Sequence, residues 1–258
     1  MSRKRPLDST GEADGQDGLH DPEYVAGLFD RMASTYGVLN YITSFGFSER
    51  WRKQCIRAIP MDHSSHRLSL VMDLMSGMGE AWPSLQSLSI DKLLAVDLSP
   101  GMCEKARRNQ SKYSINIQVA QGDALGNELP RGQADLVICC FGLKTLSDGQ
   151  RRTLTKKVFD YLKPGGQFSF VEISSASEWW LGSLYRFYLK KIIPVLGRLF
   201  GGDPTAYGML GIYTVAFGNC KDFAGQLQEA GMDAEYKELF FGCASIVSGS
   251  KPHGQIRV

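Results

Sequence analysis

The stretch VMDLMSGMGE at residues 71–80 most constrains what this chain can fold into. Residues 69–74 are apolar on both faces, as a central parallel strand is when helices cover both sides of its sheet. Gly77 and Gly79 follow, and glycine lets a backbone turn sharply and approach a ligand closely. The stretch therefore predicts a buried strand that runs into a ligand-binding turn.

A second apolar run at residues 93–96 ends in Asp97. A carboxylate that closes the second strand is placed to accept hydrogen bonds from ribose hydroxyls. A dinucleotide fingerprint needs a third small residue three positions after the second glycine, where this chain has Trp82. An indole at that position argues against NAD or FAD. The remaining pattern, Asp73-x-x-x-Gly77-x-Gly79 followed by Asp97, favours S-adenosylmethionine, which has a ribose but no phosphate. The alternative is an ordinary strand-to-helix turn.

Composition limits the class of protein further. The chain has 258 residues, of which 43% are hydrophobic and 22% charged, enough for one α/β domain with a sizeable core. A formal net charge of +2 is too slight to indicate nucleic acid, and no basic stripe interleaved with aromatics is present. We therefore expect a small-molecule partner and no nucleic acid.

The cysteines and the apolar runs indicate a compartment. Six cysteines lack metal-ligand spacing and fall mostly inside apolar runs, which predicts reduced, packed thiols and no metal site: Cys55, Cys103, Cys139, Cys140, Cys220 and Cys243. The first residues contain no apolar core of a signal peptide, and no apolar run is long enough to span a bilayer. These features predict a soluble, cytoplasmic protein.

The chain begins with a segment that cannot build a core. Residues 1–20 contain few large apolar side chains, which predicts a disordered tail, and residues 21–258 then form a single domain. Within it, residues 21–60 are expected to be helical and to include a lid over the cofactor. The helix expected at residues 51–59 is basic and amphipathic, with Arg52, Lys53 and Arg57 on its solvated face.

Strands and helices alternate through the rest of the chain. Further strands are predicted at residues 115–120, 135–141 and 167–173, and a terminal hairpin at residues 234–241 and 243–247. Helix starts are marked by Asp21-Pro22, Ser99-Pro100 and the pair Ser147 and Gln150, and a last helix is expected at residues 219–230. The pattern predicts an α/β fold with a Rossmann-like, doubly wound, seven-stranded, mostly parallel sheet and a C-terminal antiparallel hairpin.

A carboxylate also follows the third strand. Asp123 stands after residues 115–120 and is expected at the same sheet edge as Asp97. Open α/β sheets bind ligands at this edge.

Residues 24–251 resemble the UbiE family of ubiquinone and menaquinone biosynthesis C-methyltransferases, within the class I S-adenosylmethionine-dependent methyltransferases. The matching pieces are Phe29-Asp30-Arg31-Met32-Ala33 with Tyr36 and Asn40, Ser44-Phe45-Gly46 with Trp51, the turn at Asp73, Asp97 with Ser99 and Met102, Phe141-Gly142-Leu143 with Asp148, residues 161–166 (YLKPGG), Glu172 and Tyr207. The LKPGG run is common to many methyltransferases, and the Phe-Gly-Leu segment is more specific.

Two departures from the family pattern affect different parts of the site. Residues 76–80 read SGMGE where the family usually has GGTGD, which removes a hydroxyl that resembles a cofactor contact. Lys144-Thr145 stands where the family usually has arginine and asparagine, and lysine is a point charge rather than a bidentate fork. A quinone precursor and a natural-product intermediate therefore both remain open as substrates.

The resemblance implies S-adenosylmethionine as cofactor and a set of residues that bind it. The amides of residues 77–79 would hold the tail carboxylate, Asp97 the ribose, and Asp123 the adenine amino group. The full predicted set is Asp73, Gly77, Met78, Gly79, Asp97, Leu98, Met102, Asp123, Ala124, Cys140, Phe141 and Gly142.

Methylation of carbon also needs an electron-rich acceptor, and the candidate catalytic residues are Lys144, Tyr36 and Asp148. The aromatic segment at residues 179–200, within a cover segment at 175–218, is interpreted as a core-packing helix, a lid over an apolar acceptor or a patch that rests on a membrane. The predicted substrate-binding residues are Tyr36, Asn40, Trp179, Tyr185, Tyr188 and Tyr207.

Three functions stay open at this level. The favoured one is a methyltransferase that acts, on carbon, on a hydrophobic small molecule. The others are an enzyme that couples methylation to cyclisation, or replaces it by cyclisation, and a non-catalytic subunit of a biosynthetic complex. A peripheral membrane contact and a homodimer also remain open.

Overall fold

A seven-stranded sheet with the order β5-β4-β2-β6-β7-β9-β8 organises the computed structural model, which describes residues 18–60 and 67–254. Strands β2, β4, β5, β6 and β7 are parallel, and β9 is antiparallel to both β7 and β8. The strands are β2 Val71–Leu74, β4 Lys92–Asp97, β5 Asn116–Gln121, β6 Ala134–Cys140, β7 Leu162–Ile173, β8 Asp233–Leu239 and β9 Ala244–Ser250. The predicted fold is confirmed, and the last strand inserts between β7 and β8 instead of adding to the edge.

Helices cover both faces of this sheet. Successive residues of a strand point to opposite faces, so Met72 of β2 packs towards α7 and α11 while Val71 packs towards α5 and α6. These helices are α5 Trp82–Leu85, α6 Pro100–Asn109, α7 Asp148–Tyr161 and α11 Lys221–Glu229. Short pieces complete this part: β1 Arg67–Leu68 paired with β3 Ser89–Ile90, η2 Gln110–Lys112 and η3 Leu143–Thr145.

The predicted helix starts are confirmed by their capping hydrogen bonds. Asp21 accepts from the amides of Glu23 and Tyr24, and Ser99 accepts from Met102. Ser147 and Gln150 form a reciprocal capping box at the start of α7. Each cap satisfies amides that the helix leaves without an intrahelical partner, which is why local sequence located these ends well.

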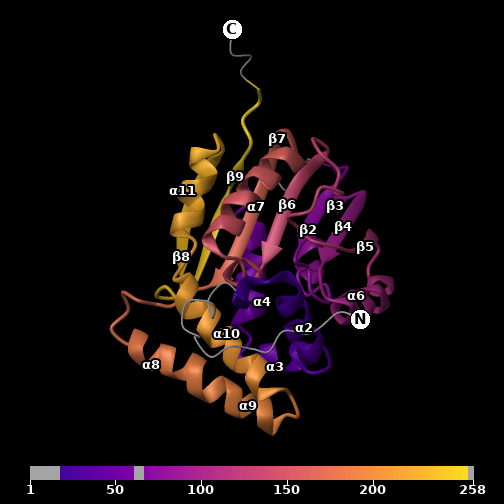
Figure 1. Ribbon diagram of the computed structural model, residues 1–258. Coiled ribbons are helices and arrows are strands. Elements are labelled where there is room, and N and C mark those ends of the chain that lie inside the picture. The colour runs from indigo at the N-terminus through magenta and orange to yellow at the C-terminus, as the bar shows by residue number, and fades with distance from the viewer. Residues whose placement is uncertain (1–17, 61–66, 255–258) are drawn as a thin grey trace, which may run out of the picture.

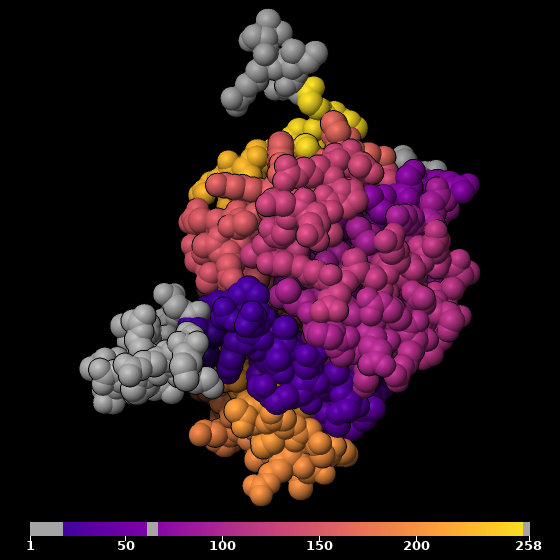
Figure 2. Space-filling model, turned by 45° about the vertical axis from the view of Figure 1, so that its right-hand side comes forward, coloured from indigo at the N-terminus to yellow at the C-terminus, as the bar shows by residue number. Residues whose placement is uncertain are grey.

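Two groups of helices gather below the carboxyl ends of the strands (Figure 1). The N-terminal group is α2 Pro22–Met32, α3 Tyr36–Thr43 and α4 Phe47–Arg57, and the later group is α8 Gly182–Phe187, the π turn η4 Tyr188–Ile192, α9 Ile193–Leu199 and α10 Pro204–Phe217. Leu28 and Leu39 of the first group pack with Tyr207 of the second. Figure 2 shows the two groups side by side at one end of the molecule.

Two boundaries differ from the prediction. Residues 18–20, which we assigned to the disordered tail, form the short helix η1 Gly18–His20, and His20 contacts the carbonyl oxygen of Thr145 at 2.8 Å. The rest of the predicted tail lies outside the described residues. Helix α4 begins at Phe47, four residues before the expected start at 51, and this shift changes which of its side chains are buried.

Candidate active site

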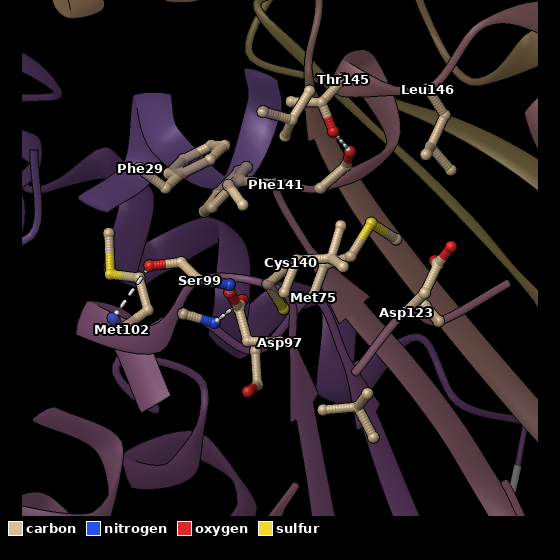
Figure 3. A pocket seen from close by; sticks show the side chains of 18 of the residues that line it. Phe29, Met75, Asp97, Ser99, Met102, Asp123, Cys140, Phe141, Thr145 and Leu146 are labelled. Atoms are coloured by element: carbon tan, nitrogen blue, oxygen red, sulfur yellow. Dashed lines mark hydrogen bonds between the residues drawn. The ribbon is translucent and has the colours of Figure 1, made fainter. Parts of the chain in front are cut away.

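A cavity that is open to solvent, with about 970 Å³ of empty space including its mouth, lies where β2, β4, β5 and β6 end. Figure 3 shows Asp97, Cys140 and Asp123 along these strand ends, with Phe29 and Met102 on one side and Leu146 on the other. The predicted cofactor residues that line it are Asp73, Gly77, Asp97, Leu98, Met102, Asp123, Ala124, Cys140, Phe141 and Gly142. Met78 and Gly79 belong to the same turn but are not among the lining residues.

The glycine turn has the backbone shape that its sequence predicts. Gly77 and Gly79 have φ of 57° and 90°, in the region that disfavours side chains. A Cβ at position 79 would lie 2.4 Å from the ring of Trp82. The amides of the glycine turn already form hydrogen bonds within the chain. Gly77 donates to the Asp97 side chain, Met78 to the Glu80 side chain, and Gly79 to the Ser76 carbonyl. The structure therefore does not support our expectation that these three amides hold the cofactor carboxylate.

Asp97 closes β4 and is held by two amides. The amide of Gly77 donates to its Oδ2 at 2.8 Å, and the amide of Ser99 donates to its Oδ1 at 2.9 Å. Burial raises the pKa of Asp97 to about 6, and the two hydrogen bonds limit the rise. A carboxylate has about four lone-pair positions, so Asp97 can still accept from ligand hydroxyls.

Trp82 is fully buried beside the glycine turn. Its indole nitrogen donates to Asp73 Oδ2 at 3.1 Å, and both residues are buried. Burial raises the pKa of Asp73 to about 7, because the indole hydrogen bond and the charge of Arg52 compensate only part of the lost hydration. The bulky residue that excluded a dinucleotide thus also anchors the acidic side chain of β2.

Arg52 is the residue that the sequence analysis misplaced most clearly. The prediction of a solvated face is wrong for it: Arg52 is 5% exposed, its guanidinium lies 4.9 Å from the Phe141 ring centre, and it lines the cavity. Lys53 and Arg57 are exposed as expected. Residues 48, 51, 52, 55 and 56 form the buried stripe of α4, so the true start of the helix turns Arg52 inward. The helical spacing of these positions was the sequence signal that could have placed Arg52 on the buried side of the helix.

Three polar groups at the cavity lack partners among the described residues. Arg52 makes no hydrogen bond or ion pair there. Glu80 Oε2 accepts from the Met78 amide at 3.0 Å, but Glu80 Oε1 and Ser76 Oγ are buried without a partner. Buried polar groups are normally satisfied, so these atoms mark a place where a polar ligand fits.

A second cavity, of about 510 Å³, adjoins the first at Tyr36 and Phe141, which line both. Its walls come from the two helix groups, from the segment at η3 and from β7: Tyr36, Asn40, Thr43, Phe141, Lys144, Ile173, Leu189, Ile193, Tyr207, Leu210, Gly211 and Thr214. Three of the predicted substrate-binding residues, Tyr36, Asn40 and Tyr207, line this cavity. Burial, followed by the charge of Glu80, raises the pKa of the Tyr36 hydroxyl far above its usual value, so Tyr36 is a hydrogen-bond donor and not a base.

Lys144 lines the second cavity, but its amine is engaged. Its Nζ donates to Glu172 Oε1 at 2.7 Å and to the Phe141 carbonyl at 2.8 Å, and both charged groups are buried. Phe141 has a φ of 71°, which is unusual for a residue with a side chain. The geometry gives Lys144 the role of holding Phe141 in this conformation.

The remaining predicted site residues lie outside both cavities. Asp148 is exposed and pairs with Arg151 and Arg152, which does not support a catalytic role. Trp179 stacks on Phe241 at 5.4 Å, and Tyr185 donates to the Cys243 carbonyl. Tyr188 donates to the Thr43 carbonyl at 2.7 Å and links η4 to α3. These aromatic residues fix the position of the insertion instead of lining the cavities.

Three observations concern the thiols, the helices and possible metal ligands. All six thiols are free, as predicted, and five of them are buried. Within the described ranges, no helix is long and apolar enough to cross a bilayer. No three acidic, cysteine or histidine side chains of those ranges are grouped to hold a metal ion.

The sheet order β5-β4-β2-β6-β7-β9-β8 is the methyltransferase fold, and together with the family match over residues 18–251 it makes the protein an S-adenosylmethionine-dependent methyltransferase. Its fold matches a crystal structure of an S-adenosylmethionine-dependent methyltransferase from Thermotoga maritima with a TM-score of 0.59 and 16% identity, over 87% of this chain and 98% of that one.

The family follows from the sequence of the same region. Residues 18–251 match the model of the ubiE/COQ5 methyltransferase family, and the chain belongs to this family. It is 27% identical to a demethylmenaquinone methyltransferase of Thermus thermophilus, over 87% of this chain and all of that one. It is 30% identical to the ubiquinone/menaquinone biosynthesis C-methyltransferase UbiE of Rickettsia akari, over 88% of this chain and 92% of that one.

Proposed function

We propose that the enzyme transfers a methyl group to a ring carbon of a reduced quinone precursor that carries an apolar chain. The observation that carries this proposal is the junction at Tyr36 and Phe141, where a cavity for a nucleoside cofactor meets a second, mostly apolar cavity. The names of the Thermus and Rickettsia relatives support the same class of acceptor.

The first cavity suits S-adenosylmethionine because its unpartnered groups match the charges of the cofactor tail. Arg52 offers a cation for the tail carboxylate, and Glu80 Oε1 offers an acceptor for the tail ammonium. Asp97 can bind the ribose hydroxyls, and Asp123 lies at the same edge for the adenine amino group. When bound, the cofactor supplies a methyl group that its positive sulfur has already activated.

The chain's own task is then to position the acceptor and keep water out. The side chains of Ile173, Leu189 and Ile193 give the second cavity apolar walls for a ring and its chain. A ring carbon is most nucleophilic when a ring oxygen is anionic, and the protonated Tyr36 can donate a hydrogen bond to that oxygen. A hydrogen bond from Tyr36 makes the ring oxygen a weaker nucleophile. This bond therefore directs the methyl group to carbon instead of oxygen.

Methyl transfer from labelled S-adenosylmethionine to a short-chain naphthoquinol tests the proposal. We expect ¹³C NMR of the product to show a new methyl group on a ring carbon. Tyr36→Phe should lower kcat by on the order of tenfold to a hundredfold. The matched control is Tyr207→Phe, because Tyr207 lines the same cavity while its hydroxyl contacts Thr35 at 3.1 Å. A methyl group on oxygen, or cofactor binding without any transfer, would contradict the proposed reaction.

A further inference from the structure

The outer side of the insertion carries a row of exposed apolar side chains. Trp180 is 84% exposed and Leu199 is 73% exposed, which is unusual for such large groups. We call this row the apolar ridge: Trp180, Leu184, Phe187, Ile192, Val195 and Leu199. Figure 1 shows α8 and α9 at the lower edge of the molecule, away from the sheet.

The π turn keeps the ridge in one line. Residues 184, 187, 192, 195 and 199 are spaced by three, five, three and four positions, and a spacing of five would leave the face of an ordinary α-helix. The π turn Tyr188–Ile192 bonds residues five apart, so Phe187 and Ile192 fall on the same side. The ridge therefore runs without interruption from α8 to α9.

The charges within the ridge segment have a single sign, and acidic residues stand only at its two ends, Glu178 and Asp203, the second of which pairs with Arg31. Residues 179–202 contain four basic residues and no acidic one. Lys190, Lys191 and Arg198 are exposed and form no ion pair with any described residue. An amphipathic helix with aromatic and leucine side chains on one face and unpaired basic groups beside them is suited to the surface of an anionic bilayer.

The same helix segment also borders the acceptor cavity. Leu189 and Ile193 line that cavity from the side opposite the ridge. The exposed ring of Phe45 has its centre 6.0 Å from the ring centre of Tyr188, and it extends the apolar surface towards α3. A molecule dissolved in a bilayer below the ridge would thus have a short path into the cavity.

We propose that the apolar ridge and the basic residues Lys190, Lys191 and Arg198 dock this protein on an anionic lipid bilayer. The apolar side chains enter the interface between headgroups and acyl chains, and the basic groups pair with lipid phosphates. Docking would serve to collect an acceptor with an apolar chain, and this purpose alone rests on the proposed function. The docking itself can be tested without turnover of a substrate.

Vesicle flotation of the full chain tests the proposal. The vesicles are phosphatidylcholine alone, or mixed with about one third of phosphatidylglycerol, an anionic lipid. We expect the protein to float with the anionic vesicles, at least tenfold more than with neutral ones, and to be released by high salt. Protein that stays in solution with anionic vesicles at low salt would overturn the proposal.

Matched charge reversals identify the surface. The variant Lys190→Glu, Lys191→Glu, Arg198→Glu should lose at least tenfold in vesicle binding. The control variant Lys156→Glu, Lys221→Glu, Lys237→Glu changes the net charge equally at exposed positions on α7, α11 and β8, and should bind as the wild type does. Equal loss in both variants would overturn the assignment to this surface.

Two further measurements distinguish docking on lipid from a subunit interface and from a loss of activity. The double variant Leu184→Asp, Leu199→Asp should abolish flotation. If it instead converts a dimer into a monomer in ultracentrifugation and leaves flotation intact, the ridge is a subunit interface and the proposal falls.

Methylation of a water-soluble quinol should be equal in the wild type and the Lys190, Lys191, Arg198 variant. Retained methylation with lost flotation supports docking, whereas wild-type flotation without methylation would count only against the proposed function.

Discussion

Arg52 is the side chain whose environment most needs a ligand. A buried guanidinium without a hydrogen-bonded anion is costly, and the face of Phe141 and the more distant charge of Asp73 compensate it only in part. The carboxylate of the cofactor tail would complete its pairing. Glu80 Oε1, also buried and without a partner, offers the complementary charge for the tail ammonium.

We therefore expect Arg52→Met to weaken S-adenosylmethionine binding by about tenfold to a hundredfold, since it removes a charge-assisted contact. Isothermal titration calorimetry measures this directly. Lys53→Met is the matched control, because Lys53 is the next residue of α4 and is exposed. If both variants bind the cofactor as tightly as the wild type does, Arg52 does not hold the tail.

Asp73 makes the stability of the cofactor-free protein depend on pH. Its pKa is about 7 in the folded state, against an ordinary value of 3.8, so the folded state binds more protons than the unfolded state between these values. The contribution of the Asp73 carboxyl to the free energy of unfolding therefore falls as the pH rises from about 4 to about 7, and it stays low above pH 7. Asp73→Asn keeps an oxygen for the Trp82 indole and removes the charge.

This variant should be more stable than the wild type by about 2–4 kcal/mol at pH 8, with the difference shrinking towards pH 4. Urea unfolding across this pH range measures the difference. A variant that is less stable at pH 8, or a difference independent of pH, would show that Asp73 is not a strained buried acid.

At the scale of elements, the pair of Lys144 and Glu172 joins the η3 turn to β7. Glu172 also accepts from the amide of Lys144 at 3.1 Å, so one carboxylate holds both the backbone and the side chain of the turn. Phe141 and Gly142, which directly precede this turn, line the cofactor cavity. A Cβ at Gly142 would lie 2.7 Å from Met75, so little space is left for the turn to move.

Lys144→Met should cost about 3–5 kcal/mol in free energy of unfolding, because it leaves Glu172 charged and unpaired inside the protein. Adding Glu172→Leu should restore much of this stability, while methylation stays impaired because Phe141 is no longer held. Denaturant unfolding and kinetics of the two variants check this. If Lys144→Met alone is as stable as the wild type, the ion pair of Lys144 and Glu172 does not stabilise the fold.

At the scale of the whole molecule, the fold was predictable because its signals are local. Alternating buried strands, capping residues and glycine turns are set by neighbours in the chain, and the carboxyl edge then brings Asp97 and Asp123 to one cavity. The residues that were misassigned depend on contacts distant in sequence. Lys144 meets Glu172 across 28 positions, and Tyr188 meets Thr43 across 145.

Arg52 and the insertion show the same limit in different ways. A charged residue in a short helix is solvated by default, and only the start of α4 at Phe47 reveals that Arg52 faces inward. The aromatic segment borders the second cavity, but its rotation is set by packing against α10 and α3. This rotation turns Leu189 and Ile193 to the cavity in place of the predicted Tyr185 and Tyr188.

The central claim is that cofactor and acceptor occupy adjoining cavities that meet at Tyr36 and Phe141. A crystal structure with S-adenosylhomocysteine and a short-chain naphthoquinol tests it most directly. We predict the cofactor tail beside Arg52 and Glu80, its sulfur facing the junction, and the quinol ring against Tyr36 in the second cavity. A quinol bound elsewhere, such as against Trp179, or a cofactor tail turned away from Arg52, would contradict the claim.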